Sequence, residues 1–199
     1  MTLLVENFLD DILNVLPVTW LPGPKEETAI AIIPGQNEPG RVIQGLEFWP
    51  EGKYCLVPGT RDDPLYLKET IISFTGRESS NLFCQGFSVA NLNTFDQMEW
   101  LIGFLINHPE IKYLIFTTAV YHLPRAVLTF LASMEKAGHF VKICPRPIWS
   151  PFCSFFEVFN SKRLEDEIKR IEVYRGKGHV ASLAMWENYK KLVQNIKEK

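Results

Sequence analysis

The sequence predicts an α/β protein with a Rossmann-like, three-layer architecture: a mainly parallel five-stranded sheet covered by helices, with extra helices at both termini. Three observations lead to this prediction. Short apolar runs alternate along the chain with helical patterns of roughly 10–14 residues, which is the order of βαβ units. The runs are apolar along most of their length, as strands are when both faces of a sheet are covered. Proline or glycine interrupts the chain after most of the runs.

Five runs have the length and composition of buried strands. In chain order they are Thr28–Ile33, Lys53–Val57, Asn81–Gln85, Lys112–Thr118 and Phe140–Cys144. We expect Pro34-Gly35 and Pro58-Gly59 to end the first two. Right-handed crossovers then make a doubly wound sheet the economical topology. After the fifth run, Pro145–Phe159 is rich in proline and aromatic residues, and we expect an ordered irregular segment there.

Helical patterns lie between these runs and after the last of them. They cover Arg41–Trp49, Pro64–Phe74, Thr94–Asn107, Pro124–Ala137, Lys162–Tyr174 and Val180–Ile196. Pro64 suits the first turn of its helix, where its missing N–H costs nothing. The last two helices are charged and amphipathic, and we treat them as additions to the core.

The composition is that of an ordinary globular chain. Of 199 residues, 46% are hydrophobic and 22% are charged, and the formal net charge is -2. These proportions exclude a mainly disordered chain, and the near-neutral balance argues against a dedicated nucleic-acid-binding protein. We expect a single domain over 1–199, with its core at about 28–182, an N-terminal helix within 1–21 and C-terminal helices within 161–199.

The N-terminal segment carries one apolar stripe at helical spacing. The stripe consists of Leu4, Phe8, Leu9, Ile12, Leu13 and Leu16. No basic region precedes it and acidic residues interrupt it, so it is not a secretory signal. We expect a helix docked on the core. The alternative is a helix that pairs in a homodimer or lies on a membrane surface, although its acidic face argues against an anionic membrane. No run approaches the ~18 apolar residues of a membrane span.

The cysteine pattern predicts a reduced protein. Cys55, Cys84, Cys144 and Cys153 include no C-x-x-C pair, and no histidine stands at zinc spacing. Three of them sit in apolar runs, as buried free thiols do. We therefore expect a cytoplasmic location and no dedicated metal site.

Ligands bind at the carboxyl ends of the strands in open parallel sheets, so the residues after each strand are the candidate site. The turn after the first strand contains Gly35, Gln36 and Asn37. Its backbone N–H groups can approach a ligand, and a plain strand-to-helix turn is the alternative. The spacing resembles a phosphate-binding P-loop, but Arg41 and Val42 stand where that loop needs Lys and Ser or Thr.

The helix after the third strand begins with a capping box, with Thr94 expected as the N-cap and Gln97 as the third helical residue. Asp96 in the first turn suits the helix dipole. One interpretation of these residues is purely structural. In the other, Asn93, Thr94 and Asp96 also face the ligand. Ser88, before this helix, lies in a stretch (Gly86–Ala90) that resembles a nucleophile elbow, but Asn91-Leu92-Asn93 separate this stretch from the helix, so a serine hydrolase is not favoured.

The densest polar cluster of the chain follows the fourth strand. Thr117 and Thr118 supply hydroxyl groups at the strand tip. Arg125 falls in the first turn of the next helix, where the dipole disfavours a cation by roughly 0.3–1 kcal/mol. It therefore needs a carboxylate, such as Asp96 or Glu38, or a bound anion.

His122 precedes the same helix, whose dipole favours the neutral imidazole, and a neutral imidazole can donate or accept a proton near pH 7. The alternative is a surface Arg–carboxylate pair with a histidine that caps local backbone. We expect the tips of the third and fourth strands to lie side by side, so that Asn93 and His122 share one hollow.

These two stretches resemble the YdcF-like family, bacterial domains of unknown function that include the SanA and ElyC envelope proteins. The matching residues are 93–97 (NTFDQ) and 117–126 (TTAVYHLPRA), against the family patterns N-T-x-(E/D)-(N/Q) and T-(S/T)-x-x-H-x-x-R-A. Weaker similarity extends over about 28–182. The chain departs from the family in the turns after the first two strands and at His179, where relatives commonly have an aspartate.

The resemblance implies a Rossmann-like fold with a ligand cleft. It permits an adenosyl-type ligand such as S-adenosylmethionine, which one member is reported to bind, and the family has no agreed reaction. The residues expected to bind a ligand are Gly35, Gln36, Asn37, Asn93, Thr94, Gln97, Thr117, Thr118, Tyr121 and Arg125. His122 and Asp96 are the candidate catalytic residues.

The leading hypothesis is a small-molecule-binding protein that takes a nucleotide-like, adenosyl or phosphorylated ligand. If it is an enzyme, His122 is its acid or base. The alternative is a non-enzymatic interaction protein linked to cell-envelope biogenesis. In that alternative the aromatic-rich segment 148–159 and the outer helices form the partner surface.

Overall fold

The computed structural model describes residues 11, 21–34, 39–60, 64–77, 79–86, 93–148 and 162–196. At its centre is a five-stranded sheet in the order β3-β2-β1-β4-β5, and each neighbouring pair is parallel. The strands are β1 (Thr28–Ile32), β2 (Tyr54–Thr60), β3 (Leu82–Gly86), β4 (Tyr113–Ala119) and β5 (Lys142–Ile148). The predicted α/β class and the mainly parallel sheet are confirmed.

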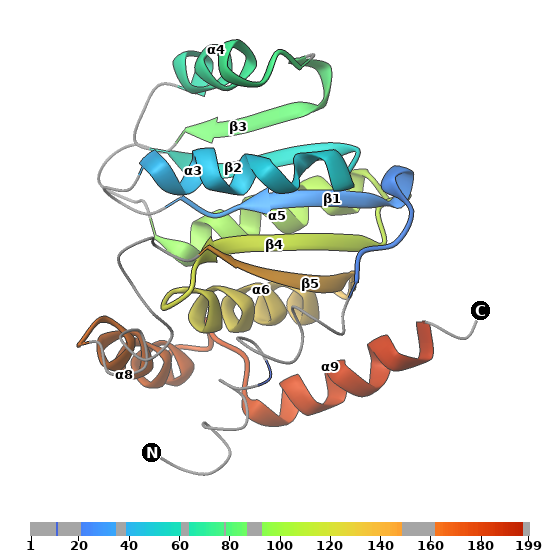
Figure 1. Ribbon diagram of the computed structural model, residues 1–199. Helices are drawn as coiled ribbons and strands as arrows, with labels where there is room; N and C mark the ends of the chain where they lie inside the picture. Colours follow the sequence, from blue (N-terminus) through green and yellow to red (C-terminus); the bar gives the residue numbers. More distant parts are fainter. Residues whose placement is uncertain are drawn as a thin grey trace.

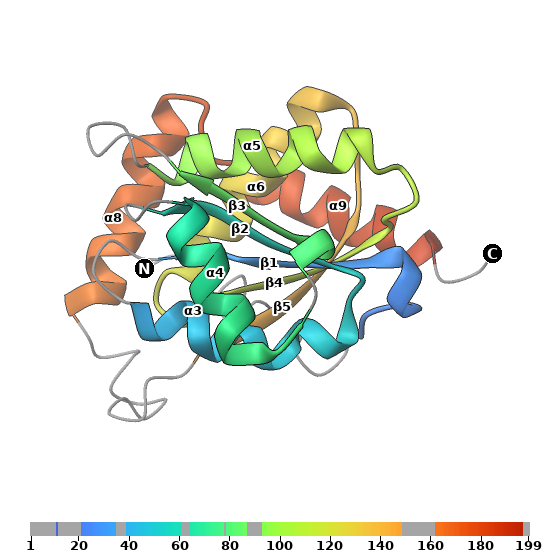
Figure 2. The same cartoon turned by 90° about the horizontal axis from the view of Figure 1, so that it is seen from above.

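Helices cover both faces of the sheet (Figure 1), and Figure 2 shows the three layers from above. On one face lie α3 (Pro39–Gly45) and α4 (Pro64–Thr75), and on the other α5 (Thr94–Asn107) and α6 (Leu123–Ala137). The same side as α6 also holds α8 (Lys162–Gly176) and α9 (Leu183–Ile196). Short 3-10 helices occupy Lys25–Glu27, Leu46–Glu51 and Ser79–Asn81.

Each face of the sheet has its own core because alternate strand residues point to opposite sides. Ala31 and Phe116 belong to the core beneath α5 and α6, whereas Ile30 and Ile32 belong to the core beneath α3. The backbone of α3 approaches β1 closely. A Cβ atom on Gly45 would lie 2.7 Å from Cγ2 of Ile32, so this position requires glycine.

β2 runs past the residues predicted to end it. It continues through Pro58 and Gly59 to Thr60. Its pairs with β1 end at Leu56, whereas its pairing with β3 goes on, with Pro58 opposite Gln85. No β1 residue needs a hydrogen bond from Pro58, so proline is tolerated there. Gly59 takes a φ of +71° at the irregularity that follows.

β5 also runs past its predicted end at Cys144. It includes Pro145 and Pro147 and reaches Ile148, inside the segment predicted to be irregular. β5 is an edge strand of the sheet, and within the described ranges its one partner strand is β4. An edge strand accommodates proline because its outward-facing N–H groups have no partner strand.

The tips of β3 and β4 are not neighbours, contrary to the prediction, because β2 and β1 lie between them. The prediction assumed that strands consecutive in the chain are adjacent. Instead, after β3 the chain crosses back over β2 and β1, and β4 pairs with the side of β1 that faces away from β2. The strand order therefore reverses between β1 and β4, and open α/β sheets bind their ligands in the crevice at such a point.

α8 and α9 are the two helices predicted after the sheet. Figure 1 shows α8 at the end of the molecule where the strands finish. α9 is fastened to the start of β5 by Tyr189, whose hydroxyl accepts from the Ile143 N–H and donates to the Val141 carbonyl, each at 2.7 Å.

Several predictions fall on residues outside the described ranges. Of the N-terminal helix predicted within 1–21, the structure describes Asp11 and Leu21, and Asp11 accepts a hydrogen bond of 2.6 Å from Lys190 Nζ. The aromatic-rich segment lies outside them apart from Ile148. The homodimer stays a prediction. None of the helices within the described ranges has both the length and the apolar character that crossing a bilayer requires.

Candidate functional site

The starts of α5 and α6 meet, although the strands that precede them are apart. Arg125 donates from Nη1 to Oγ1 of Thr94 at 2.8 Å. Both helices lie on the same face of the sheet and pack against each other (Figure 2). The two stretches predicted to share a site are therefore in contact, through helix packing rather than through adjacent strands.

The N-cap of α5 is Asn93, not Thr94 as predicted. Asn93 Oδ1 accepts from the Asp96 N–H at 3.0 Å, and Asn93 Nδ2 donates to the Asp96 carboxylate at 2.6 Å. The helix begins one residue earlier than the predicted box because asparagine is as good an N-cap as threonine. The Thr94 hydroxyl is not used as a cap and instead accepts from Arg125.

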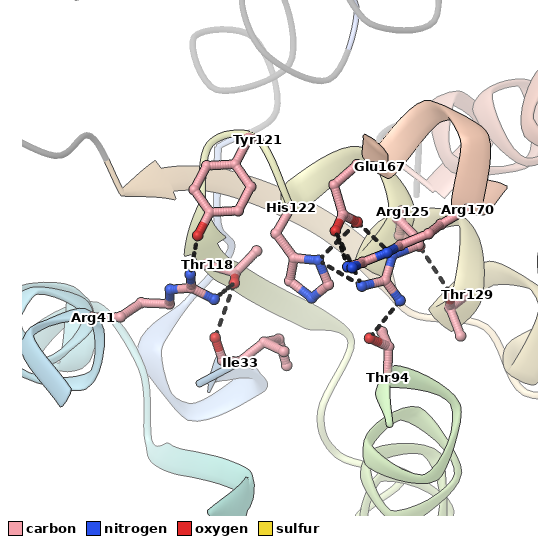
Figure 3. Close-up of polar contacts among 10 residues, drawn as sticks. All are labelled: Ile33, Arg41, Thr94, Thr118, Tyr121, His122, Arg125, Thr129, Glu167 and Arg170. Carbon is pink, nitrogen blue, oxygen red and sulfur yellow. Dashed lines mark hydrogen bonds and ion pairs between the residues drawn. The ribbon is translucent and has the colours of Figure 1, made fainter. Parts of the chain in front are cut away.

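Glu167 of α8 supplies the carboxylate that Arg125 requires (Figure 3). The prediction named Asp96, which pairs with Asn93, and Glu38, which lies outside the described residues. Arg125 donates from Nε to Oε2 of Glu167 and from Nη2 to Oε1 at 3.4 Å. Arg170 Nη1 donates to Oε1 at 2.8 Å.

The Glu167 side chain is 6% exposed. Burial alone would raise the pKa of this carboxyl, but the hydrogen bonds and charges of His122 and Arg125 outweigh burial and lower the pKa to about 2. Glu167 is therefore ionised at neutral pH. One buried carboxylate thus joins the first turn of α6 to α8.

His122 stands beside this pair as the residue before α6. Its Nδ1 lies 3.2 Å from Glu167 Oε2 and 3.2 Å from Arg125 Nη2. Burial lowers the pKa of His122, and the charges of Arg125 and Arg41 lower it further, against the opposing effect of Glu167. These effects favour the neutral imidazole near pH 7, and burial, rather than the helix dipole named in the prediction, is the largest of them.

A second polar cluster joins the ends of β1 and β4 (Figure 3). Arg41 of α3, which is 5% exposed, donates from Nη1 to Thr118 Oγ1 at 3.2 Å and from Nη2 to the Tyr121 hydroxyl at 2.9 Å. The Thr118 hydroxyl donates to the Ile33 carbonyl at the end of β1, at 2.9 Å. Arg41 thereby links the residues that follow the two strands at the reversal of strand order.

A shallow hollow, open to solvent and with an enclosed volume of about 20 Å³, adjoins Arg125. Its lining consists of Asn93, Thr94, Phe95, Arg125, Thr129, Tyr174, His179 and Val180. The Phe95 and His179 rings are stacked with centroids 4.4 Å apart, and the Tyr174 ring is stacked 6.2 Å from His179. The Arg125 guanidinium carbon is 5.9 Å from the centroid of Tyr174. The hollow therefore combines a guanidinium group with aromatic walls.

The remaining predicted residues have other surroundings. Gln97 is buried and donates to the carbonyl groups of Pro58 and Gly59 at 3.1 and 3.3 Å, so it holds the end of β2. Thr117 is fully buried, and within the described part of the chain its hydroxyl makes no hydrogen bond. The predictions on Gly35, Gln36, Asn37 and Ser88 lie outside the described residues.

The predicted site did not include Arg41 and Glu167, although each has a sequence feature that indicates a structural or functional role. Arg41 is a cation in the first turn of a helix, the feature that drew attention to Arg125. Glu167 falls on the apolar stripe of α8, in line with the buried residues Leu164 and Ile171. A carboxylate on such a stripe needs a buried cation as its partner.

Comparison with family models, with curated proteins and with solved structures finds no match for this chain. The resemblance to the YdcF-like family therefore stays a prediction. Among the described residues, no group of three or more His, Cys, Asp or Glu side chains is arranged to hold a metal ion.

Proposed function

We propose that this protein binds a small molecule that carries an anionic group and a flat ring, such as a nucleotide-like, adenosyl or phosphorylated compound. The observation that carries the proposal is the hollow in which Arg125 and Thr94 stand opposite aromatic side chains. Its position at the carboxyl ends of the strands agrees with where open α/β sheets bind ligands.

The charge beside the hollow favours an anion. Arg125 and Arg170 share the single carboxylate of Glu167, and His122 is neutral near pH 7, so this group carries an excess of one positive charge. The first turns of α5 and α6 add backbone N–H groups and the positive ends of two helix dipoles. A phosphate or carboxylate that contacts Arg125 would gain charge-assisted hydrogen bonds.

The aromatic residues favour a planar ring. Tyr174, His179 and Phe95 line the hollow, and flat rings pack favourably against aromatic side chains. The enclosed volume of the hollow is far below the roughly 300–1,000 Å³ of a drug-sized pocket, so we expect most of the ligand to lie outside it, over its rim. The same groups fit S-adenosylmethionine, since its carboxylate matches Arg125 and its adenine matches the rings.

The proposal places the protein in the cytoplasm. The free thiols of Cys55, Cys84 and Cys144 support this placement, because reduced cysteines are usual in that compartment.

Thermal unfolding with a defined set of probes tests the proposal. The set is inorganic phosphate, adenosine, adenosine 5′-monophosphate and S-adenosylmethionine, which separates the anion from the ring. A ligand at 100 times its Kd stabilises the native state by about 2.7 kcal/mol. For a chain of this length we expect Tm to rise by roughly 5–10 °C with the best probe.

Three variants test whether the rise in Tm comes from ligand binding in the hollow. Arg125→Gln removes the anion contact and should weaken binding of adenosine 5′-monophosphate roughly 10- to 100-fold, the value of a charged hydrogen bond. Tyr174→Leu removes a ring wall and leaves the Arg125–Glu167 pair in place. Lys169→Gln, at an exposed position of α8, is the charge-matched control. Absence of binding by the wild type, or equal binding by a folded Arg125→Gln protein, would rule the proposal out.

A further inference from the structure

The Glu167 carboxylate has as many hydrogen-bond neighbours as it has lone pairs. Oε1 receives Arg170 Nη1 and Arg125 Nη2, and Oε2 receives Arg125 Nε. The fourth neighbour is His122 Nδ1, 3.2 Å from Oε2. An ionised carboxylate offers about four acceptor positions. A proton on Nδ1 of His122 would fill the last of them.

The other tautomer is less favourable at this position. If Nδ1 carried no proton, its lone pair would face the second lone pair of Oε2 across 3.2 Å. Nδ1 could then accept from Arg125 Nη2, which is also 3.2 Å away. That guanidinium already donates to both oxygens of Glu167 and to Thr94, whereas the fourth acceptor position of the carboxylate has no other donor among the described residues.

We infer that Glu167 and His122 form a carboxylate–imidazole pair in which Nδ1 holds the proton and Nε2 is left as the proton acceptor. His122 does not line the hollow itself but contacts Arg125, which does. The inference rests on the proposed function, because a proton acceptor acts only beside a bound ligand. Figure 3 shows Nδ1 turned toward Glu167 and Arg125, with the opposite side of the ring turned away from them. Both contacts of the ring to charged groups are made by Nδ1.

The chemistry that this pair supports is removal of a proton from a hydroxyl group or a water molecule. The oxygen keeps its electron pair, its proton moves to Nε2, and the ring becomes an imidazolium. Glu167 stays ionised and offsets that new charge, so it is a positioning residue for His122. The charged groups around the ring are Arg125 of α6, Glu167 and Arg170 of α8, and Arg41 of α3. Arg125 and Arg41 oppose protonation of His122, so the imidazolium would return its proton readily.

The wild-type protein itself provides the first test. Long-range ¹H–¹⁵N correlation spectra distinguish the two neutral tautomers and the imidazolium. The chain has 4 histidines, and His122→Gln assigns the signal of interest. We expect His122 to be neutral at pH 7 with its proton on Nδ1. A spectrum of the Nε2–H tautomer, or of the imidazolium, would overturn the inference.

Glu167→Gln tests whether the carboxylate sets the tautomer. The glutamine amide can donate to Nδ1, so we expect the Nε2–H form to increase and the pKa of His122 to fall further. Glu165→Gln, at an exposed position of the same helix, is the matched control and should leave the His122 signals unchanged. An unchanged tautomer in folded Glu167→Gln protein would contradict the role of Glu167. If that variant does not fold, the wild-type spectrum still decides the tautomer.

Adenosine 5′-monophosphate separates this inference from the proposed function. If the nucleotide binds and shifts the His122 Nε2 resonance, His122 faces the ligand. If it binds and that resonance does not move, His122 is not the acceptor and the inference is wrong while the proposed function stands. If no probe binds, the proposed function is wrong, whereas an Nδ1–H spectrum would still establish the carboxylate–imidazole pair.

Discussion

At the scale of single residues, a shift of one position in the start of α5 decides what Thr94 does. With Asn93 as the N-cap, the Thr94 hydroxyl is available to Arg125. Sequence reasoning identified both residues as part of the site and exchanged their roles. Capping propensities of asparagine and threonine are too similar to choose between neighbouring positions.

Replacing Asn93 by alanine tests this assignment. Asn93→Ala removes the acceptor of the Asp96 N–H, and we expect the free energy of unfolding in urea to fall by about 1 kcal/mol. Asn107→Ala, an exposed asparagine at the other end of α5, is the control and should change stability by less than about 0.5 kcal/mol. Equal losses in the two variants would contradict the cap.

The carboxylate partner of Arg125 could not be predicted because it lies far away in the sequence, unlike the two neighbouring cap candidates. The position of Arg125 in the first turn of a helix correctly indicates that it needs a negative charge. The charge comes from Glu167, 42 residues away on a helix that follows the whole sheet. Nothing local in the sequence ties α8 to α6, so the partner becomes visible only when the helices are packed together.

At the scale of elements, apolar periodicity correctly located the strands and helices. The expectation that a strand ends at proline was wrong for two strands. The predicted bounds of α5 agree with the structure. β2 and β5 continue through Pro58 and Pro145 because each proline stands where one neighbouring strand is missing. Whether a proline ends a strand depends on the neighbours of that strand, which the local sequence does not state.

Two glycines in different elements should respond to alanine with opposite signs. Gly59→Ala forces a side chain into the left-handed region and should lower the free energy of unfolding by roughly 1–2 kcal/mol. Gly103 lies inside α5, and a Cβ atom there meets nothing within 4 Å. Gly103→Ala should therefore raise stability by about 0.5–1 kcal/mol. Urea denaturation measures both changes, and a destabilised Gly103→Ala would refute the account of α5.

The Tyr189 hydroxyl bonds α9 to the start of β5. Tyr189→Phe leaves the buried Ile143 N–H and Val141 carbonyl without their partner, and we expect a loss of roughly 2 kcal/mol or more. Tyr66→Phe removes the hydroxyl of a tyrosine that is 67% exposed and serves as the control. Denaturation curves of the two variants that coincide would mean that this hydroxyl does not hold α9 in place.

At the scale of the whole molecule, alternation of strands and helices determined the α/β class but not the strand order. β4 can join the sheet beside β3 or beside β1 with the same local pattern. In the structure it joins beside β1, which places the reversal of strand order next to Arg41 and His122. The site is therefore formed by four separate parts of the chain: the start of α3, the start of α5, the residues from the end of β4 into α6, and α8 with the residues that follow it.

This arrangement makes the stability of the whole protein depend on pH. The pKa of His122 is lowered in the folded state, so the unfolded chain takes up this proton more readily. The free energy of unfolding should therefore be constant near pH 7–8 and fall as pH drops below about 6.5. Glu167 acts in the same direction at lower pH. Its pKa falls from 4.5 to about 2 on folding, so roughly 3 kcal/mol is lost between those values.

Urea denaturation at pH 7.5 and pH 5.0 measures the first of these losses. His122→Gln should abolish most of the difference between the two pH values, whatever its own stability, because the titrating group is gone. His139→Gln, outside the site, should retain the difference. Glu167 keeps its charge at pH 5.0 in the folded protein, so the comparison isolates the imidazole. A wild-type protein that is equally stable at both pH values would show that His122 is not buried in neutral form beside Glu167 and Arg125.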